Sequence, residues 1–286
     1  MASLKEIKTR IQSVKSTQKI TSAMKMVSSA KLRKAEKTIE NFYPYQQGLN
    51  QLLNSFLSEE EDIISGLAVE RDVKRIAVVP FSSNSSLCGG FNANVIKRMN
   101  QLVKSYASLG NENVLIYPVG KKVAKAAAKI GFTPRGNYES MADKPNYQAA
   151  TELADELMRL FLNKEIDRVE FIYHHFRNKS SQVLMSETLL PIPLKQHSKG
   201  SVRQNYLVEP DRQTLMDQLV PKVIRLQIYT ALLDSNASEH AARTMAMQIA
   251  TDNANDLLQE LSLQYNKSRQ QAITNELLDI LGGSFK

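Results

Sequence analysis

The sequence has little cysteine and no long hydrophobic run. Its single cysteine, Cys88, excludes an intrachain disulfide framework. The longest apolar runs, such as IAVVPF at Ile76–Phe81, are far shorter than the roughly 20 residues that span a bilayer. The first residues, MASLKEIKTR, lack the apolar core of a secretory signal. We therefore expect a soluble or peripheral protein in a reducing, cytoplasmic setting.

Glycine and proline are also scarce at both ends of the chain. Of the eleven glycines only Gly48 precedes residue 66, and neither Gly nor Pro occurs from Lys222 to Leu281. Because these two residues most strongly interrupt regular structure, their absence predicts two long terminal helices. We expect an N-terminal helical segment at 1–60, a central domain at 70–200 and a C-terminal helical segment at 211–286 that packs with the first.

The central part alternates short β-branched runs with helical stretches. Strands are expected at 75–80 (RIAVVP), 113–119 (NVLIYPV) and 168–176 (RVEFIYHHF), and helices at 93–109, 121–130 and 147–163. A further run from Gln182, followed by Pro191 and Pro193, is typical of an edge strand. The alternation predicts a Rossmann-like α/β domain. The fold class is therefore α/β, with a long antiparallel coiled coil of the two terminal helices.

The N-terminal segment carries one narrow apolar stripe with a spacing of three and four residues. We expect its members to be Leu4, Ile7, Ile11, Val14, Thr17, Ile20, Met24, Val27, Ala35, Ile39 and Phe42. Pro44 is expected to bend or interrupt this helix. The stripe predicts a partner helix along its whole length.

The C-terminal segment supplies a matching heptad seam with small residues at its middle, which would let two helices approach closely. The expected seam positions are Ile224, Ile228, Ala231, Ser235, Ser238, Ala242, Met245 and Ile249. The simplest way to bury both stripes is to pair the two ends antiparallel. A homo-oligomeric coiled coil is the alternative, but it leaves neither stripe an intramolecular partner.

Positive charge is concentrated at the N-terminus. Residues 1–37 hold ten Lys or Arg against Glu6 and Glu36, so this segment alone carries +8, which equals the formal charge of the whole chain. Such a segment suits an acidic protein, a nucleic acid or an anionic membrane surface. The residues expected to face a partner are Lys5, Lys8, Arg10, Lys15, Lys19, Lys25, Lys31, Arg33 and Lys34.

No group of residues assembles an active site. The loop SSNSSLCGGFN at Ser82–Asn92 lacks the spacing and the lysine of a P-loop, so we interpret it as a structural turn. His174 and His175 are adjacent on an expected strand and must point to opposite faces, so they cannot chelate one metal together. We expect neither a metal nor a cofactor. An α/β enzyme that uses Cys88 as nucleophile remains a candidate, as does a basic coiled-coil adaptor for nucleic acid.

Four stretches resemble one known family. KEIKTRIQSVKSTQKITSAMKMVSSAKLRKAE, LCGGFN, SEHAARTMAMQIATDNANDLL and LQYNKSRQQAITNELLDILGG are similar to the gamma subunits of F-type ATP synthases. The resemblance covers both ends strongly and the middle weakly. Ser83–Ser86 stand where the family usually carries Asp, then Lys or Arg, then Gly, and Ser284 stands where it usually carries Ala.

The resemblance implies a rotor shaft of the bacterial type without catalytic groups of its own. Such a shaft turns inside a ring of α and β subunits, contacts the epsilon subunit and the c-ring, and couples proton flow to ATP synthesis or hydrolysis. It would lie at the cytoplasmic face of the plasma membrane, meet the membrane only through the complex and bind no nucleic acid.

The resemblance also assigns candidate residues for coupling the shaft to the catalytic ring. These are Met24, Arg243, Gln270, Thr274 and Glu276. Arg243 would pair with a carboxylate of the ring, and the basic residues of the N-terminal segment would face acidic loops of the β subunits.

Overall fold

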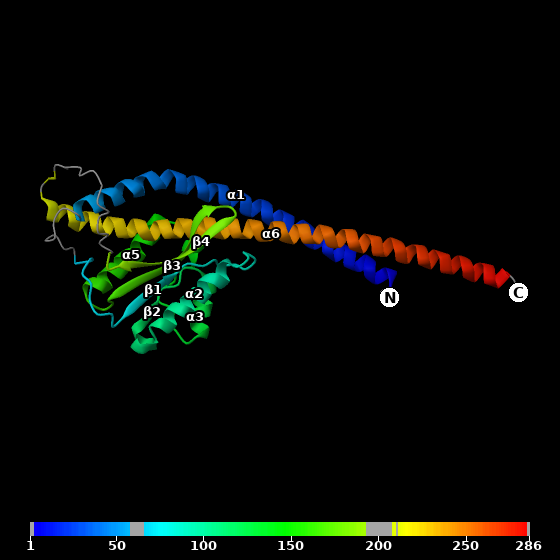
Figure 1. The fold of residues 1–286 in the computed structure, drawn as a ribbon, viewed down its shortest axis with the longest axis horizontal. Coiled ribbons are helices and arrows are strands. Elements are labelled where there is room, and N and C mark those ends of the chain that lie inside the picture. Colours follow the sequence, from blue (N-terminus) through cyan, green and yellow to red (C-terminus); the bar gives the residue numbers. More distant parts are fainter. Residues whose placement is uncertain (1–2, 58–65, 193–207, 210, 285–286) are drawn as a thin grey trace, which may run out of the picture. The chain divides into compact units, whose positions relative to one another are not determined.

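The computed structural model describes residues 3–57, 66–192, 208–209 and 211–284. The chain forms two compact units. Unit 1 comprises Met1–Ala30 and Arg243–Lys286, and unit 2 comprises Lys31–Ala242. The two terminal helices are long enough to contribute to both units: α1 runs from Leu4 to Leu57 and α6 from Arg212 to Ser284 (Figure 1).

Helix α1 begins at a capping box. The Ser3 backbone N–H donates to the Glu6 carboxylate at 2.8 Å, and the Glu6 backbone N–H donates to the Ser3 hydroxyl at 3.2 Å. This exchange satisfies two N–H groups that the first helical turn leaves without partners. The helix continues through Pro44, which lies inside it, so of the two expected effects an interruption does not occur.

A four-stranded sheet with the order β2-β1-β3-β4 forms the centre of unit 2. Strands β1 (Ile76–Pro80), β2 (Val114–Ile116) and β3 (Arg168–Asn178) are mutually parallel where they pair, and β4 (Ser181–Leu190) joins β3 antiparallel at the edge. The strands predicted from the β-branched runs are therefore confirmed, including the edge strand.

Alternate residues of β1 point to two separate hydrophobic layers. Ile76 and Val78 pack in a cluster with residues of α2 (Phe91–Ser105) and α3 (Lys121–Lys129). Ala77 and Val79 belong to the cluster that contains α5 (Tyr147–Leu162) and the first part of α6. The sheet is thus covered by helices on both faces, as its alternating pattern predicts. Three short helices complete the part of unit 2 that the structure describes: η1 (Ala107–Leu109), η2 (Asn111–Asn113) and α4 (Glu139–Asp143).

The adjacent histidines of β3 do point to opposite faces. The buried ring of His174 stacks on Phe91 of α2, with 4.6 Å between centroids. The Nδ1 atom of His175 lies 2.6 Å from a carboxylate oxygen of Asp234 on α6. The pair therefore ties two layers of unit 2 to the same strand.

Candidate rotor surfaces

The helical pair of unit 1 runs antiparallel and is joined through polar side chains. Gln18 Nε2 donates to Asn255 Oδ1 at 3.2 Å, and Lys25 Nζ donates to Gln248 Oε1 at 3.0 Å. Between them the hydroxyl of buried Thr251 donates to that of Thr21 at 2.8 Å. Residue numbers rise on α1 as they fall on α6, which establishes the antiparallel direction. We call this set of contacts the polar seam.

The inward face of α1 departs from the predicted stripe in its middle. Leu4, Ile7, Ile11 and Val14 are shielded as expected, but the shielded positions then continue through Gln18, Thr21, Lys25 and Ser28. Thr17, Ile20 and Val27 are exposed, and Met24 is half-buried. The prediction followed hydrophobicity at this point, whereas the helix keeps a regular heptad spacing and places polar residues inward. Ala35 and Ile39 of unit 2 are buried and Phe42 is half-buried, as predicted.

The predicted seam of α6 is also shifted. In unit 2 the residues that pack with Leu32, Ala35 and Ile39 of α1 are Leu233, Ala237 and Ala241. Ser238 instead donates its hydroxyl to the His174 carbonyl of β3 at 3.1 Å, and Ser235 faces the small gap between α6 and Phe81. Ile224, Ile228 and Ala231 are buried in the large core cluster that α6 shares with the sheet and α5.

The shift has a physical cause. Every residue of α6 from Ala231 to Ala241 is buried, so this stretch packs on all sides and small residues line more than one face. A spacing of three and four residues then fits two neighbouring faces equally well. In unit 1, Met245 is half-buried and Ile249 is 57% exposed, while Met247 and Thr251 are buried in their place. Ala242, which is the last residue of unit 2, is half-buried.

The basic residues lie on the outside of α1 with one exception. Lys25 is half-buried and donates to Gln248 in the polar seam. The exposed members of the set are Lys5, Lys8, Arg10, Lys15, Lys19, Lys31, Arg33 and Lys34. Lys31, Arg33 and Lys34 belong to unit 2 and the others to unit 1. Their side chains are thus available to an acidic partner.

The candidate coupling residues fall into two environments within unit 1. Gln270, Thr274 and Glu276 are exposed, and the Thr274 hydroxyl donates back to the Gln270 carbonyl at 2.9 Å. Arg243 is only 7% exposed, and Met24 is half-buried. A direct ion pair between Arg243 and another subunit would therefore require this side chain to leave its buried position.

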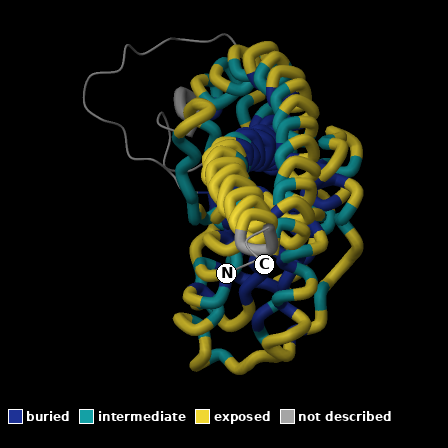
Figure 2. Tube along the Cα trace, turned by 90° about the vertical axis from the view of Figure 1, so that its right-hand side faces the viewer, coloured by how far each residue is buried: buried dark blue, intermediate teal, exposed yellow. Residues whose placement is uncertain are grey.

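The end of α6 carries a surface that sequence reasoning missed. Past Ser268 only Ala272 is even partly shielded among residues up to Leu281, because α6 continues beyond the start of α1 (Figure 1). Figure 2 shows this end of the helix as almost wholly exposed. The large apolar side chains on it include Ile273, Leu277, Leu278 and Ile280, and we call these four the apolar tip. The stretch ITNELLDI contained the signal, an apolar repeat that lies beyond the part of α6 paired with α1.

The Ser82–Asn92 loop is held by internal contacts at both ends, while Ser85, Ser86 and Leu87 at its tip are exposed. The Cys88 side chain is 1% exposed, and its sulfur accepts from Asn92 Nδ2 at 3.1 Å. The first N–H groups of α3, which could otherwise bind an anion, already have acceptors: Lys121 donates to Asn84 Oδ1, and Val123 donates to the Ser82 hydroxyl. Cys88 is therefore buried and engaged within the loop, and the interpretation of the loop as a structural turn stays a prediction.

No helix in the described ranges combines the length and apolarity that crossing a membrane requires.

Residues 3–285 match the family model described as ATP synthase. The chain is 60% identical to the ATP synthase gamma chain of Phocaeicola vulgatus, over 99% of each sequence, and 41% identical to that of Flavobacterium johnsoniae, over 99% of this chain and 98% of the relative.

Solved structures share the fold. A chain in the mitochondrial ATP synthase of Euglena gracilis, in a structure of its OSCP, F1 and c-ring, aligns with a TM-score of 0.67 at 20% identity over 99% of this chain and 93% of that chain. A chain in the central stalk and c-ring structure of the Tetrahymena thermophila enzyme aligns with a TM-score of 0.58 at 24% identity, over 81% and 99%. Together with the match across nearly the full length of its relatives, the paired terminal helices and the central α/β layer place this chain in the family of ATP synthase gamma chains.

Proposed function

We propose that this chain is the central-stalk rotor of an F-type ATP synthase and turns inside a ring of α and β subunits. The apolar tip of α6 carries the proposal, since it leaves large apolar side chains such as Leu278, which is 60% exposed, without a partner on α1. A contiguous exposed apolar surface marks an interaction site. Burying the exposed part of each of these side chains against surrounding subunits would contribute roughly 1 kcal/mol to the binding free energy.

Rotation would act through contacts that differ among the three catalytic positions. A shaft whose outer face is not three-fold symmetric favours a different conformation in each β subunit, and only such differential contact can shift a conformational equilibrium. Moving one β subunit from 1:99 to 99:1 between two states requires about 5.5 kcal/mol. Exposed Lys and Arg side chains on α1, which can form charge-assisted hydrogen bonds with acidic loops, could supply much of it.

Gln270, Thr274 and Glu276 suit direct contact with the ring because their side chains are exposed next to the apolar tip. Arg243 and Met24 suit an indirect role. Since Arg243 is buried within the chain, it would position α6 and would not itself reach a carboxylate of the ring.

The remaining assignments follow from family membership. The chain would be a peripheral part of the membrane-associated F1 complex at the cytoplasmic face of a bacterial plasma membrane, held there by the c-ring and the epsilon subunit. It would contribute no catalytic group and bind no nucleic acid. The buried position of Cys88 supports the first of these statements.

The experiment purifies the assembled complex from its membranes through a tag on this chain, then measures ATP hydrolysis and ATP-driven proton uptake into vesicles. We expect nucleotide-binding α and β subunits to co-purify. The tip variant Leu277→Ser with Leu278→Ser should keep hydrolysis but move several-fold fewer protons per ATP. Leu162→Ser, at an exposed leucine of α5, serves as the matched control and should pump normally.

Two results would refute the proposal. One is a tagged chain that co-purifies with nucleic acid instead of α and β subunits. The other is a tip variant whose pumping per ATP equals that of the unaltered complex.

A further inference from the structure

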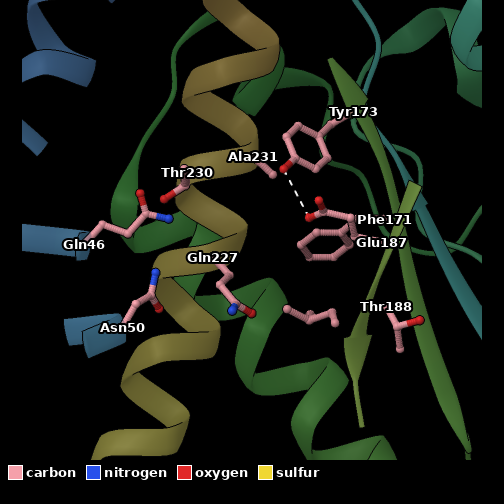
Figure 3. A pocket seen from close by; sticks show the side chains of 10 residues that line it. Gln46, Asn50, Phe171, Tyr173, Glu187, Thr188, Gln227, Thr230 and Ala231 are labelled. Carbon is pink, nitrogen blue, oxygen red and sulfur yellow. Dashed lines mark hydrogen bonds between the residues drawn. The ribbon is translucent and has the colours of Figure 1, made fainter. Parts of the chain in front are cut away.

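A cavity of about 510 Å³ lies within unit 2, between α1, α6 and the β3–β4 hairpin (Figure 3). Gln46 and Asn50 line it from α1, Gln227 and Thr230 from α6, and Tyr173 and Glu187 from the hairpin. Its volume falls within the roughly 300–1,000 Å³ range of small-molecule sites.

The cavity carries negative charge in a chain whose formal net charge is +8. Glu187 is the only carboxylate among its described lining residues, and no Lys, Arg or His lines it there. Tyr173 donates its hydroxyl to Glu187 Oε2 at 3.3 Å. Burial is the main cause that raises the pKa of Tyr173, and the charge of Glu187 raises it further, so the phenol remains a donor.

A second carboxylate near Tyr173, that of Asp234, already has a hydrogen-bond partner. Asp234 is buried, and its Oδ2 atom lies 2.6 Å from His175 Nδ1. Glu187 is exposed, unlike Asp234, and the part of the chain that the structure describes holds no Lys, Arg or His within ion-pair distance of it. One exposed carboxylate at the cavity can therefore pair with a cation that binds there.

The rest of the lining suits a nitrogen cation. The side-chain amides of Gln46, Asn50 and Gln227 offer oxygen acceptors, and an ammonium or guanidinium group supplies only donors. Phe171 adds an aromatic ring, and the face of such a ring attracts cations. Figure 3 shows these groups distributed over both helices and the hairpin, so a bound cation would be contacted from several sides.

We propose that this cavity binds an alkylammonium or guanidinium group with Glu187 as its counter-charge. A guanidinium can donate two parallel hydrogen bonds to one carboxylate, which makes it the better fit of the two. The group can belong to a small free amine or to a Lys or Arg side chain of a neighbouring subunit, since both present the same chemistry.

The test titrates the purified full-length chain with agmatine, which carries both cations, and with N-butylurea, a neutral analogue of similar shape. Binding is measured by calorimetry and by NMR. We expect saturable binding of agmatine and about tenfold weaker binding of N-butylurea. Glu187→Gln should weaken agmatine binding about tenfold, which is the loss expected for a charged hydrogen-bonded pair.

Two further variants test whether the effect is specific to the cavity. Glu112→Gln removes an exposed carboxylate elsewhere in unit 2 and should bind agmatine like the unaltered chain. Gln227→Leu removes one acceptor of the cavity while keeping Glu187, and it should weaken binding several-fold. If agmatine does not saturate the unaltered chain, or if Glu187→Gln binds it equally well, the proposal is overturned.

A final arm separates the two sources of the cation by repeating the titration on the assembled complex. Unchanged agmatine binding identifies the site as one for a free amine, and loss of binding identifies a subunit side chain as the occupant. Either result supports the cation site. The outcome is independent of the rotor function, which co-purification and proton pumping test separately.

Discussion

Acid should destabilise unit 2 through His174. This side chain is 3% exposed and stacks on Phe91. Burial lowers the pKa of its imidazole from 6.5 to about 4, because the protonated ring would lose its hydration. Since one pKa unit corresponds to about 1.4 kcal/mol, protonating His174 costs roughly 3 kcal/mol more in the folded chain than in the unfolded chain.

The sign follows from proton linkage. The unfolded chain binds a proton at His174 as the pH falls below 6.5, whereas the folded chain does so only near pH 4. Stability from this residue is therefore fully present above pH 6.5 and is lost as the pH falls toward 4. Integrating between these limits gives a loss of about 2 kcal/mol at pH 5.

The assay compares urea unfolding at pH 7.5 and pH 5, followed by a probe in the α/β part. Carboxylates also respond to acid, so the variant His174→Phe provides the reference, with His174→Met as a second choice if the larger ring disturbs packing. The unaltered chain should lose about 2 kcal/mol more than either variant between the two pH values. His175→Gln, one residue along β3, should keep the full acid response of His174.

Equal acid responses in the unaltered chain and in both His174 variants would refute this reasoning. So would an NMR titration of the His174 ring with a midpoint near 6.5, because a group with that midpoint contributes no difference between the folded and unfolded states.

Two further predictions concern the polar seam and a backbone constraint. Thr21→Val alone should cost unit 1 less than about 1 kcal/mol, because the Thr251 hydroxyl can still donate to the Met247 carbonyl at 2.7 Å. Amide hydrogen exchange near Thr251 measures the change, and a loss of about 2 kcal/mol or more would contradict this account. Gly120→Ala should destabilise unit 2 by more than 2 kcal/mol, because its φ is +100° and a Cβ would collide with the Ser82 carbonyl. Gly110→Ala, at φ +82° with open space around it, is the matched control and should cost about 1 kcal/mol; similar melting temperatures for the two variants would show that the close contact does not matter.

The sequence predicted where helices and strands lie better than it predicted which face of each helix is buried. The scarcity of Gly and Pro outside the middle located both long helices, and the β-branched runs located every strand of the described sheet. Helix faces were harder because Gln18, Thr21 and Lys25 lie inward while Ile20 and Val27 lie outward. Hydrophobicity alone therefore assigns the wrong face of this part of α1 to the interior. In a pair of only two helices, polar side chains can lie inward because they form hydrogen bonds with each other.

The prediction of the seam residues of α6 was wrong for a different reason. Ser235 and Ser238 have the size and spacing of seam residues, yet they face the α/β layer, because α6 is surrounded there and small residues serve two contacts at once. The apolar tip and the cavity beside Glu187 were also missed. The cavity depends on residues from α1, β3, β4 and α6, which only the fold brings together.

The distribution of polarity in unit 1 bears on how a shaft can work. Each hydroxyl or amide contact of the polar seam stabilises the pair by roughly 1 kcal/mol, about half of what a buried leucine contributes. At the same time, Ile20, Met26, Val27 and Ile249 are exposed on the outside. Apolar residues such as Ile7 and Leu261 are buried elsewhere along the pair, so the weakly held part is the polar seam, beside which the exposed apolar side chains present a surface that a partner would bury. Much of the rigidity of unit 1 should therefore come from the subunits around it, which makes its outer face, more than its interior, the place where contact energy can differ from one catalytic position to the next.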